Sequence, residues 1–289
     1  LAAGMAVVRP HEYAKMSFLL GLIVICWVGL TVAMTVTEAL LLTHLGIRYL
    51  PVAMLLTASL TVVGSLTYAS QLARRSLVWI LGATLALNSC LLMLATWGLQ
   101  RGALWLGLPL FAFYGSSFTL LSAQCFGLAG ECIDTHSSKR LFPVLAVACT
   151  CGELLGGILV ASGSARISPS GWLLVWTTTQ ALAMAWLLLH RKSLEQWRQA
   201  VVGANVGRHK IGLAQAVSYL RTAPMARALA LLLASMVLCQ GASQYLFSNV
   251  FAVEFSDAQG LTRFLGQLVT FSNLVKLVVA FWIRSEKRR

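Results

Sequence analysis

The chain has 289 residues, of which 58% are hydrophobic and only 11% are charged. A soluble domain carries about 25% charged residues, so this composition excludes an ordinary water-soluble fold and predicts an integral membrane protein. The formal net charge of +13 comes from basic residues dispersed over several segments. That dispersion suits loops anchored against anionic membrane lipids and argues against a nucleic-acid-binding surface.

Six stretches contain no Asp, Glu, Lys or Arg, and each is long enough to cross a bilayer, which takes about 20 apolar residues. They are Met16–Thr37, Tyr49–Ala73, Ser76–Gln100, Gly102–Gly130, Ile167–His190 and Ala228–Val253. Two further apolar runs, Leu141–Gly163 and Phe264–Ile283, are each interrupted by one charge, Glu153 and Lys276, but keep a spanning length. The sequence therefore predicts an all-α bundle of eight transmembrane helices. A re-entrant hairpin at either interrupted run is the alternative.

The basic residues predict the orientation of these spans. With the N-terminus inside, seventeen of the 22 Lys and Arg residues fall in inside segments, four fall in outside loops and Lys276 lies in the membrane. By the positive-inside rule, both termini are predicted to be cytoplasmic, in what is expected to be a bacterial inner membrane.

A basic segment, residues 191–227, separates the sixth span from the seventh. Within it, the stripe from Ile211 to Leu220 predicts a helix lying on the membrane surface, either as a structural tether or as a partner site. The chain thus places six spans before a long linker and further spans after it, which is the layout of transporters built from two six-helix halves. We therefore expect an N-terminal half over residues 1–190, a cytoplasmic linker over 191–227 and two helices of a second half over 228–289.

Three stretches carry a resemblance to a known family. They are TEALLLTHLGIRYLPVAMLLTASLTVVGSLTYASQLARRS (Thr37–Ser76), DTHSSKRLFPVLAVACTCGELLGGILV (Asp134–Val160) and YLFSNVFAVEFSDAQGLTRFLGQLVTFSNLVKLVV (Tyr245–Val279). An acidic residue closing the first span, a basic loop after the second and a glycine-rich fifth helix make the chain similar to major facilitator proteins of the ATP:ADP antiporter, or nucleotide-transporter-like, family.

The resemblance implies a fold of twelve helices, of which this chain holds the first eight and is truncated at its C-terminal side. It also implies alternating-access transport of a nucleotide or another organic anion, by antiport against a counter-substrate or together with a proton. A polyphosphate at mid-membrane calls for several inward Lys or Arg side chains, and the first six spans have none away from their ends. The alternative function is a transport-inactive membrane anchor or sensor module of a larger protein.

Glu153 and Lys276 are the charged candidates inside the membrane. Glu153 lies close to the middle of its span, where an ionised carboxylate must face a cavity, pair with a cation or be protonated. It is expected either to line the transport path as a proton carrier or to form a structural hydrogen bond between helices. Lys276 either extends its ammonium to the membrane surface or faces a central cavity and binds an anion, and Asn273 lies on the same helical face.

Weaker candidates for substrate or ion binding come from the first and seventh spans. Glu38 near the outer end of the first span has a predicted role in gating, or is simply satisfied by solvent or Arg48. Gln240, Gln244 and Tyr245 share one side of the seventh span and can donate neutral hydrogen bonds to a substrate or to another helix.

Motifs for catalysis and cofactor binding are not found in the sequence. A phosphate-binding Walker loop, a Gly-x-Ser-x-Gly elbow and a His-Glu-x-x-His helix are all missing. Neither Cys132 with His136 nor Cys149 with Cys151 offers enough ligands for zinc. We therefore expect no enzymatic activity, no catalytic residues, no metal and no cofactor. The expected partners are membrane lipids, a small-molecule substrate, and a coupling proton or counter-substrate.

Overall fold

The computed structural model describes residues 9, 12–72, 74–202, 222–255 and 257–286, and these residues are almost entirely helical. Eight of the described helical segments are long and apolar enough to cross a membrane, as the sequence predicts. Their helices are α2 (Tyr13–Leu40), α3 (Leu50–Leu72), α4 (Leu77–Gln100), α5 (Gly107–Cys132), α6 (Thr135–Gly163), α7 (Pro169–Leu189), α10 (Pro224–Glu254) and α11 (Ala258–Glu286). Glu153 and Lys276 therefore lie within continuous helices, and no re-entrant hairpin forms at either place.

Local sequence signals explain where several helices begin and turn. The side chains of Ser76, Asp134 and Ser168 accept hydrogen bonds from backbone N–H groups in the first turns of α4, α6 and α7. Gly46 and Gly102 have φ angles of 83° and 84°, a left-handed conformation that favours glycine, and they allow the tight turns after α2 and α4. Short connections therefore hold consecutive spans together.

Helix α2 forms the centre of the bundle and contacts α5, α6 and α7. In its span, 67% of the most apolar stretch is buried, against 0% for α10. A π-helical turn (Leu41–Leu45) and a short 3-10 helix, η3 (Ile47–Tyr49), follow α2. We call the end of the bundle where α2 begins the basic end, because Arg74, Arg75 and Arg140 lie there, and the other the opposite end.

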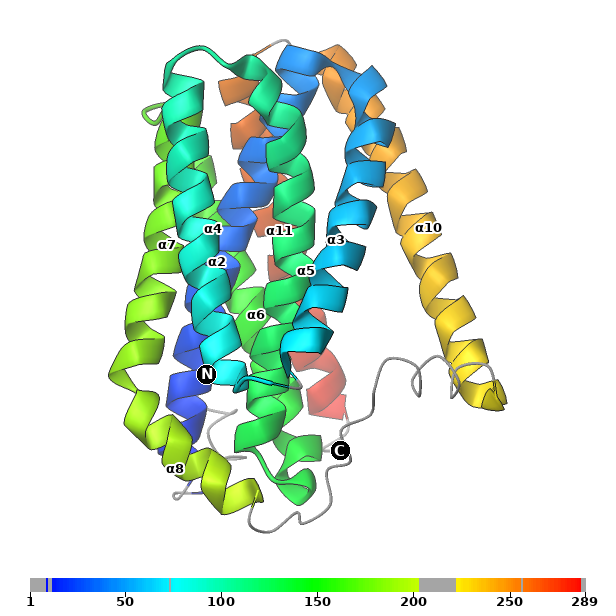
Figure 1. The fold of residues 1–289 in the computed structure, drawn as a ribbon. Helices are drawn as coiled ribbons and strands as arrows, with labels where there is room; N and C mark the ends of the chain where they lie inside the picture. The colour runs from blue at the N-terminus through cyan, green and yellow to red at the C-terminus, as the bar shows by residue number, and fades with distance from the viewer. Residues whose placement is uncertain (1–8, 10–11, 73, 203–221, 256, 287–289) are drawn as a thin grey trace.

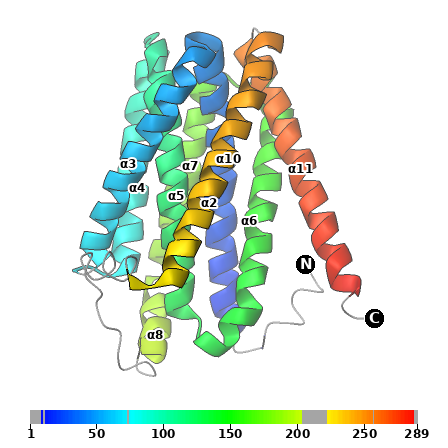
Figure 2. The ribbon, with the colours of Figure 1, turned by 90° about the vertical axis from the view of Figure 1, so that its right-hand side faces the viewer.

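Helices α10 and α11 are attached to the bundle in different ways. Helix α11 packs along α6, whereas α10 contacts the bundle only near the opposite end and leans away from it toward the basic end (Figures 1 and 2). Of the described residues of α10, Ser248 is the one that is buried. The attachment of α10 is therefore confined to its last two turns.

Glycines bring α6 into close contact with helices on two sides. A Cβ atom added at Gly152 would lie 3.0 Å from the carbonyl oxygen of Val24, and one at Gly156 would lie 2.9 Å from that of Val28, both on α2. On another side of α6, a Cβ at Gly157 would lie 3.0 Å from the carbonyl oxygen of Gly266 on α11. Small residues therefore let the backbones of α2, α6 and α11 approach one another directly.

At each end of α4, an arginine next to the helix stacks on a tryptophan of the helix. The guanidinium carbon of Arg75 lies 4.7 Å from the ring centroid of Trp79, and that of Arg101 lies 3.6 Å from Trp97. Both tryptophans are about half exposed. Such amphipathic rings are typical of the membrane–water interface.

The start of the linker is helical and packs on the bundle. Helix α8 (Arg191–Val202) follows α7 directly, Leu194 is fully buried, and the ring of Trp197 lies 6.0 Å from that of Phe18 on α2. The surface helix predicted between Ile211 and Leu220 lies outside the described residues. The linker is therefore anchored to the basic end through its first two turns, a feature not predicted from the sequence.

Candidate functional site

The two charges inside the membrane lie against each other. The Nζ atom of Lys276 on α11 is 3.4 Å from Oε2 of Glu153 on α6 and 3.1 Å from Oδ1 of Asn273. Asn273 is buried, and its side-chain nitrogen donates to the backbone oxygen of Val269, 2.9 Å away. The structure thus brings together three of the residues that the sequence singled out.

The close crossing of α6 and α11 positions this cluster. Gly266, Thr270 and Asn273 follow one another at helical spacing on the face of α11 that meets Gly157 of α6. Glu153 lies one turn before Gly157, on the side of α6 between its contacts with α2 and α11. Because the glycines let the helices approach closely, the two long charged side chains can meet beside the crossing.

The ion pair is deep in the membrane but not enclosed by the described residues. Glu153 lies about 27 Å of helical rise from Thr135 and about 15 Å from Gly163. The side chain of Lys276 is 60% exposed and that of Glu153 is 26% exposed. An ammonium group at this depth is costly against hydrocarbon, so in a bilayer it must be covered by water, a solute or further protein, or extend toward the membrane surface.

Glu38 forms a second intramembrane polar contact, between α2 and α10. It is buried, and its Oε1 accepts a hydrogen bond of 2.7 Å from Oγ of Ser248. Arg48 is exposed and forms no ion pair with it. The expectation that solvent or Arg48 satisfies Glu38 is therefore wrong, because α10 and α11 cover this end of α2.

The charges of both Glu38 and Glu153 act on the phenol group of Tyr114 on α5. Its ring packs with that of Phe118, at a centroid distance of 6.3 Å. We call six polar side chains from α2, α5, α6, α10 and α11 the polar strip: Glu38, Tyr114, Glu153, Ser248, Asn273 and Lys276. Tyr114 was not predicted from the sequence, because a single tyrosine within an apolar span is not part of any recognisable spacing pattern.

The other candidates on α10 are less enclosed. Gln240 and Tyr245 are exposed and Gln244 is half-buried. Ser248, which the sequence analysis missed, follows Gln240 and Gln244 at intervals of four residues, and this spacing is the signal that could have identified it. The three residues mark one stripe of α10, of which the structure places only Ser248 against the bundle.

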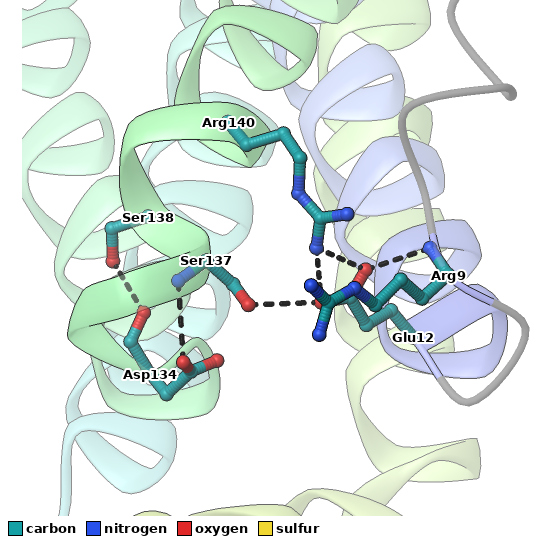
Figure 3. A network of polar contacts seen from close by, with 6 residues as sticks. All are labelled: Arg9, Glu12, Asp134, Ser137, Ser138 and Arg140. Atoms are coloured by element: carbon teal, nitrogen blue, oxygen red, sulfur yellow. Dashed lines mark hydrogen bonds and ion pairs between the residues drawn. The ribbon is translucent and has the colours of Figure 1, made fainter.

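A third polar network ties α2 to α6 at the basic end (Figure 3). Both carboxylate oxygens of Glu12 accept from Nη2 of Arg140, at 2.6 and 2.8 Å, and Oε1 also accepts from Oγ of Ser137 at 2.9 Å. Oε2 accepts from the backbone N–H of Arg9 at 2.8 Å. Because Glu12 is buried at this end and the four hydrogen bonds come from three residues, the network holds the first turns of α2 and α6 in fixed register.

Comparison with models of protein families, with curated proteins and with solved structures finds no match to the chain. The similarity to nucleotide transporters therefore stays a prediction. The side chains of the polar strip can bind an anion at Lys276, hold a proton on Glu153 or Glu38, and donate hydrogen bonds.

Proposed function

We propose that the chain forms the substrate path of a secondary active transporter of the major-facilitator type, which moves a small organic anion by alternating access. The observation that carries the proposal is the Glu153–Lys276 pair, an accessible ion pair between the fifth and eighth spans at membrane depth. Charged side chains inside a membrane are costly, and they mark substrate or ion pathways. A purely structural role accounts less well for an ammonium that is 60% exposed.

The pair suggests how binding and coupling are linked. A carboxylate or phosphate group that reaches Lys276 competes with Glu153 for the ammonium. Glu153, once displaced, is an unpaired carboxylate in a medium of low dielectric constant, which favours taking up a proton. Anion binding and proton binding then support each other, as a proton-coupled transporter requires.

The number of cations bears on the substrate class. Lys276 is the one ammonium in the polar strip of the described chain. A single ammonium suits a solute with one carboxylate or phosphate group, whereas a nucleotide polyphosphate calls for several cations. We therefore propose an organic anion with a single carboxylate or phosphate group ahead of a nucleotide.

The test is transport by the gene product that carries this chain, reconstituted in liposomes and supplied with radiolabelled carboxylates, phosphate monoesters and nucleotides. Lys276→Met is expected to abolish uptake, and Glu153→Gln to leave anion binding but remove the dependence of uptake on pH. Lys192→Met on α8 is the matched control and is expected to transport like the wild type, because Lys192 lies outside the spans. Since the two charges form one pair, their effects in the double variant are expected to be non-additive.

Two results would contradict the proposal. Unchanged uptake in both Lys276→Met and Glu153→Gln would assign the pair a structural role. A wild-type protein that takes up none of these anions would favour the alternative of a transport-inactive anchor or sensor module.

A further inference from the structure

The end of α10 attaches to the bundle through one polar contact and an apolar cluster around it. Ser248 is the buried residue of this helix, and its hydroxyl donates to Glu38 of α2 over 2.7 Å. Around this contact, Phe251 of α10 and Phe255, which directly follows α10, pack near Ala39 of α2 and Leu261 and Leu265 of α11. The remaining turns of α10, toward the basic end, are exposed. Movement of α10 away from the bundle would therefore uncover Glu38.

Among the described residues, no positively charged group pairs with Glu38. α10 contributes the neutral Ser248, α11 contributes apolar side chains, and α5 contributes Tyr114, on which the charges of Glu38 and Glu153 both act. Arg48 on η3 and Arg263 on α11 are exposed at the same end, and neither forms an ion pair with Glu38 among the described residues. An ionised carboxylate buried without a cation is costly, whereas a protonated one with a hydroxyl partner is not.

We propose that Glu38 is a proton-binding site. Its carboxyl group binds a proton while the end of α10 is docked against the bundle, and it releases the proton when that end of α10 moves away. The juxtaposition that carries this inference is a buried carboxylate on the first span whose hydrogen-bond partner belongs to the seventh. With the proton bound, Glu38 is neutral and the hydroxyl of Ser248 remains its partner. With the proton released to water, the charge favours the arrangement in which solvent reaches Glu38.

Thermodynamic linkage makes the two events reciprocal. If docking of α10 favours the protonated form of Glu38, then protonation must favour docking by the same free energy. The site itself does not require transport. Its use as a proton-operated gate, separate from the Glu153–Lys276 pair, rests on the function proposed above.

Infrared difference spectroscopy of the reconstituted gene product tests the site directly, because a protonated carboxyl group has a carbonyl stretch that an ionised one lacks. We expect a band from a protonated carboxyl group at neutral pH. Glu38→Gln is expected to remove it, and Ser248→Ala to shift its frequency because a hydrogen bond is lost. Glu254→Gln is the matched control, since Glu254 is exposed in the last turn of α10, and is expected to keep the band unchanged.

Hydrogen exchange of the last two turns of α10 tests the coupling to docking. Protection factors, which correct for the intrinsic effect of pH on exchange, are expected to fall as the pH rises in the wild type and in Glu254→Gln. In Glu38→Gln, which cannot ionise, protection is expected to stay high at every pH. These measurements do not depend on a substrate, so they stand or fall separately from the transport assay.

Several outcomes would overturn the inference. They are the absence of a protonated-carboxyl band in the wild type, a band that survives in Glu38→Gln, and protection of α10 that is independent of pH in the wild type. If Glu38→Gln does not insert into the membrane, the Ser248→Ala spectrum decides. A shifted band supports the site, and an unshifted band overturns it.

Discussion

The crossing of α6 and α11 allows a prediction with a matched control. A Cβ atom at Gly157 would lie 3.0 Å from both the carbonyl oxygen of Gly266 and the backbone nitrogen of Thr270, and 2.6 Å from Oγ1 of Thr270. Ordinary contact begins at 3.4 Å, so the two backbones must separate by several tenths of an ångström. The Thr270 side chain cannot simply rotate away, because its hydroxyl donates to Gly266 over 2.7 Å. Gly157→Ala is therefore expected to strain the crossing.

The magnitude follows from a comparison with Gly241→Ala. Both substitutions gain the same helix propensity, about 1 kcal/mol, but a Cβ at Gly241 meets nothing within 4 Å. Overpacking a close contact costs about 1–3 kcal/mol. We therefore expect the free energy of unfolding of Gly157→Ala to be lower than that of Gly241→Ala by about 1–3 kcal/mol.

Reversible unfolding of the two variants in mixed detergent micelles measures this difference. Using two Gly→Ala substitutions cancels the propensity of alanine in the micelle, so the difference reports the packing at the crossing alone. A Gly157→Ala variant as stable as Gly241→Ala, or more stable, would refute the close approach of α6 and α11. The position of Lys276 beside Glu153 would then lose its structural basis.

Three further predictions concern the ends of the spans. Glu12→Gln removes the negative charge that pairs with Arg140 and is expected to lower the free energy of unfolding by about 1–3 kcal/mol. This loss is smaller than that for a fully buried ion pair, because Arg140 is partly exposed. Asp134→Ala removes the N-cap of α6 and is expected to cost about 1 kcal/mol in the same unfolding measurement. Burial acts to raise the pKa of Asp134, but hydrogen bonds from the start of α6 outweigh burial and hold the pKa below its usual value. The stabilisation that this ionised N-cap provides is therefore present above about pH 3.9 and is lost as the pH falls through the folded-state pKa. In a protein freed of its native cysteines, a cysteine at Ser168 is expected to react with an impermeant reagent from outside intact cells and one at Ser193 is not, and the reverse pattern would overturn the predicted orientation.

Much of the helical architecture could be predicted because a bilayer restricts the chain so strongly. Backbone polar groups inside hydrocarbon must be satisfied within each segment, so a run such as Ser76–Gln100 has to be a helix. The same cost of a charge at membrane depth identified Glu153 and Lys276 as candidates. Their contact could not be predicted, because it depends on which helices pack together, and that depends on Gly157 and Gly266 meeting across the crossing.

The errors have a similar cause. From the sequence alone Glu38 is near a helix end, where water or Arg48 can reach it, but the end of α10 covers it in the folded chain. Glu12 was missed because it precedes the first apolar run, and its partner Arg140 is 128 residues away. A helix at the start of the linker was missed because the whole of 191–227 was predicted as a basic linker, although Leu194 and Trp197 lie three apart on the buried side of this helix.

The two arginine–tryptophan stacks on α4 have a consequence for the membrane in which the protein is found. Trp79 and Trp97 are eighteen positions apart, which corresponds to about 27 Å along the helix. The hydrocarbon core of an average bilayer is about 30 Å thick, and that of a thin membrane is a few ångströms less. With an aromatic anchor at each interface, α4 is matched to a thin or average bilayer while nearly upright and has little length to spare for tilting. In a thick, sterol-rich membrane the lipid would have to compress around it, so hydrophobic mismatch favours the thinner membranes.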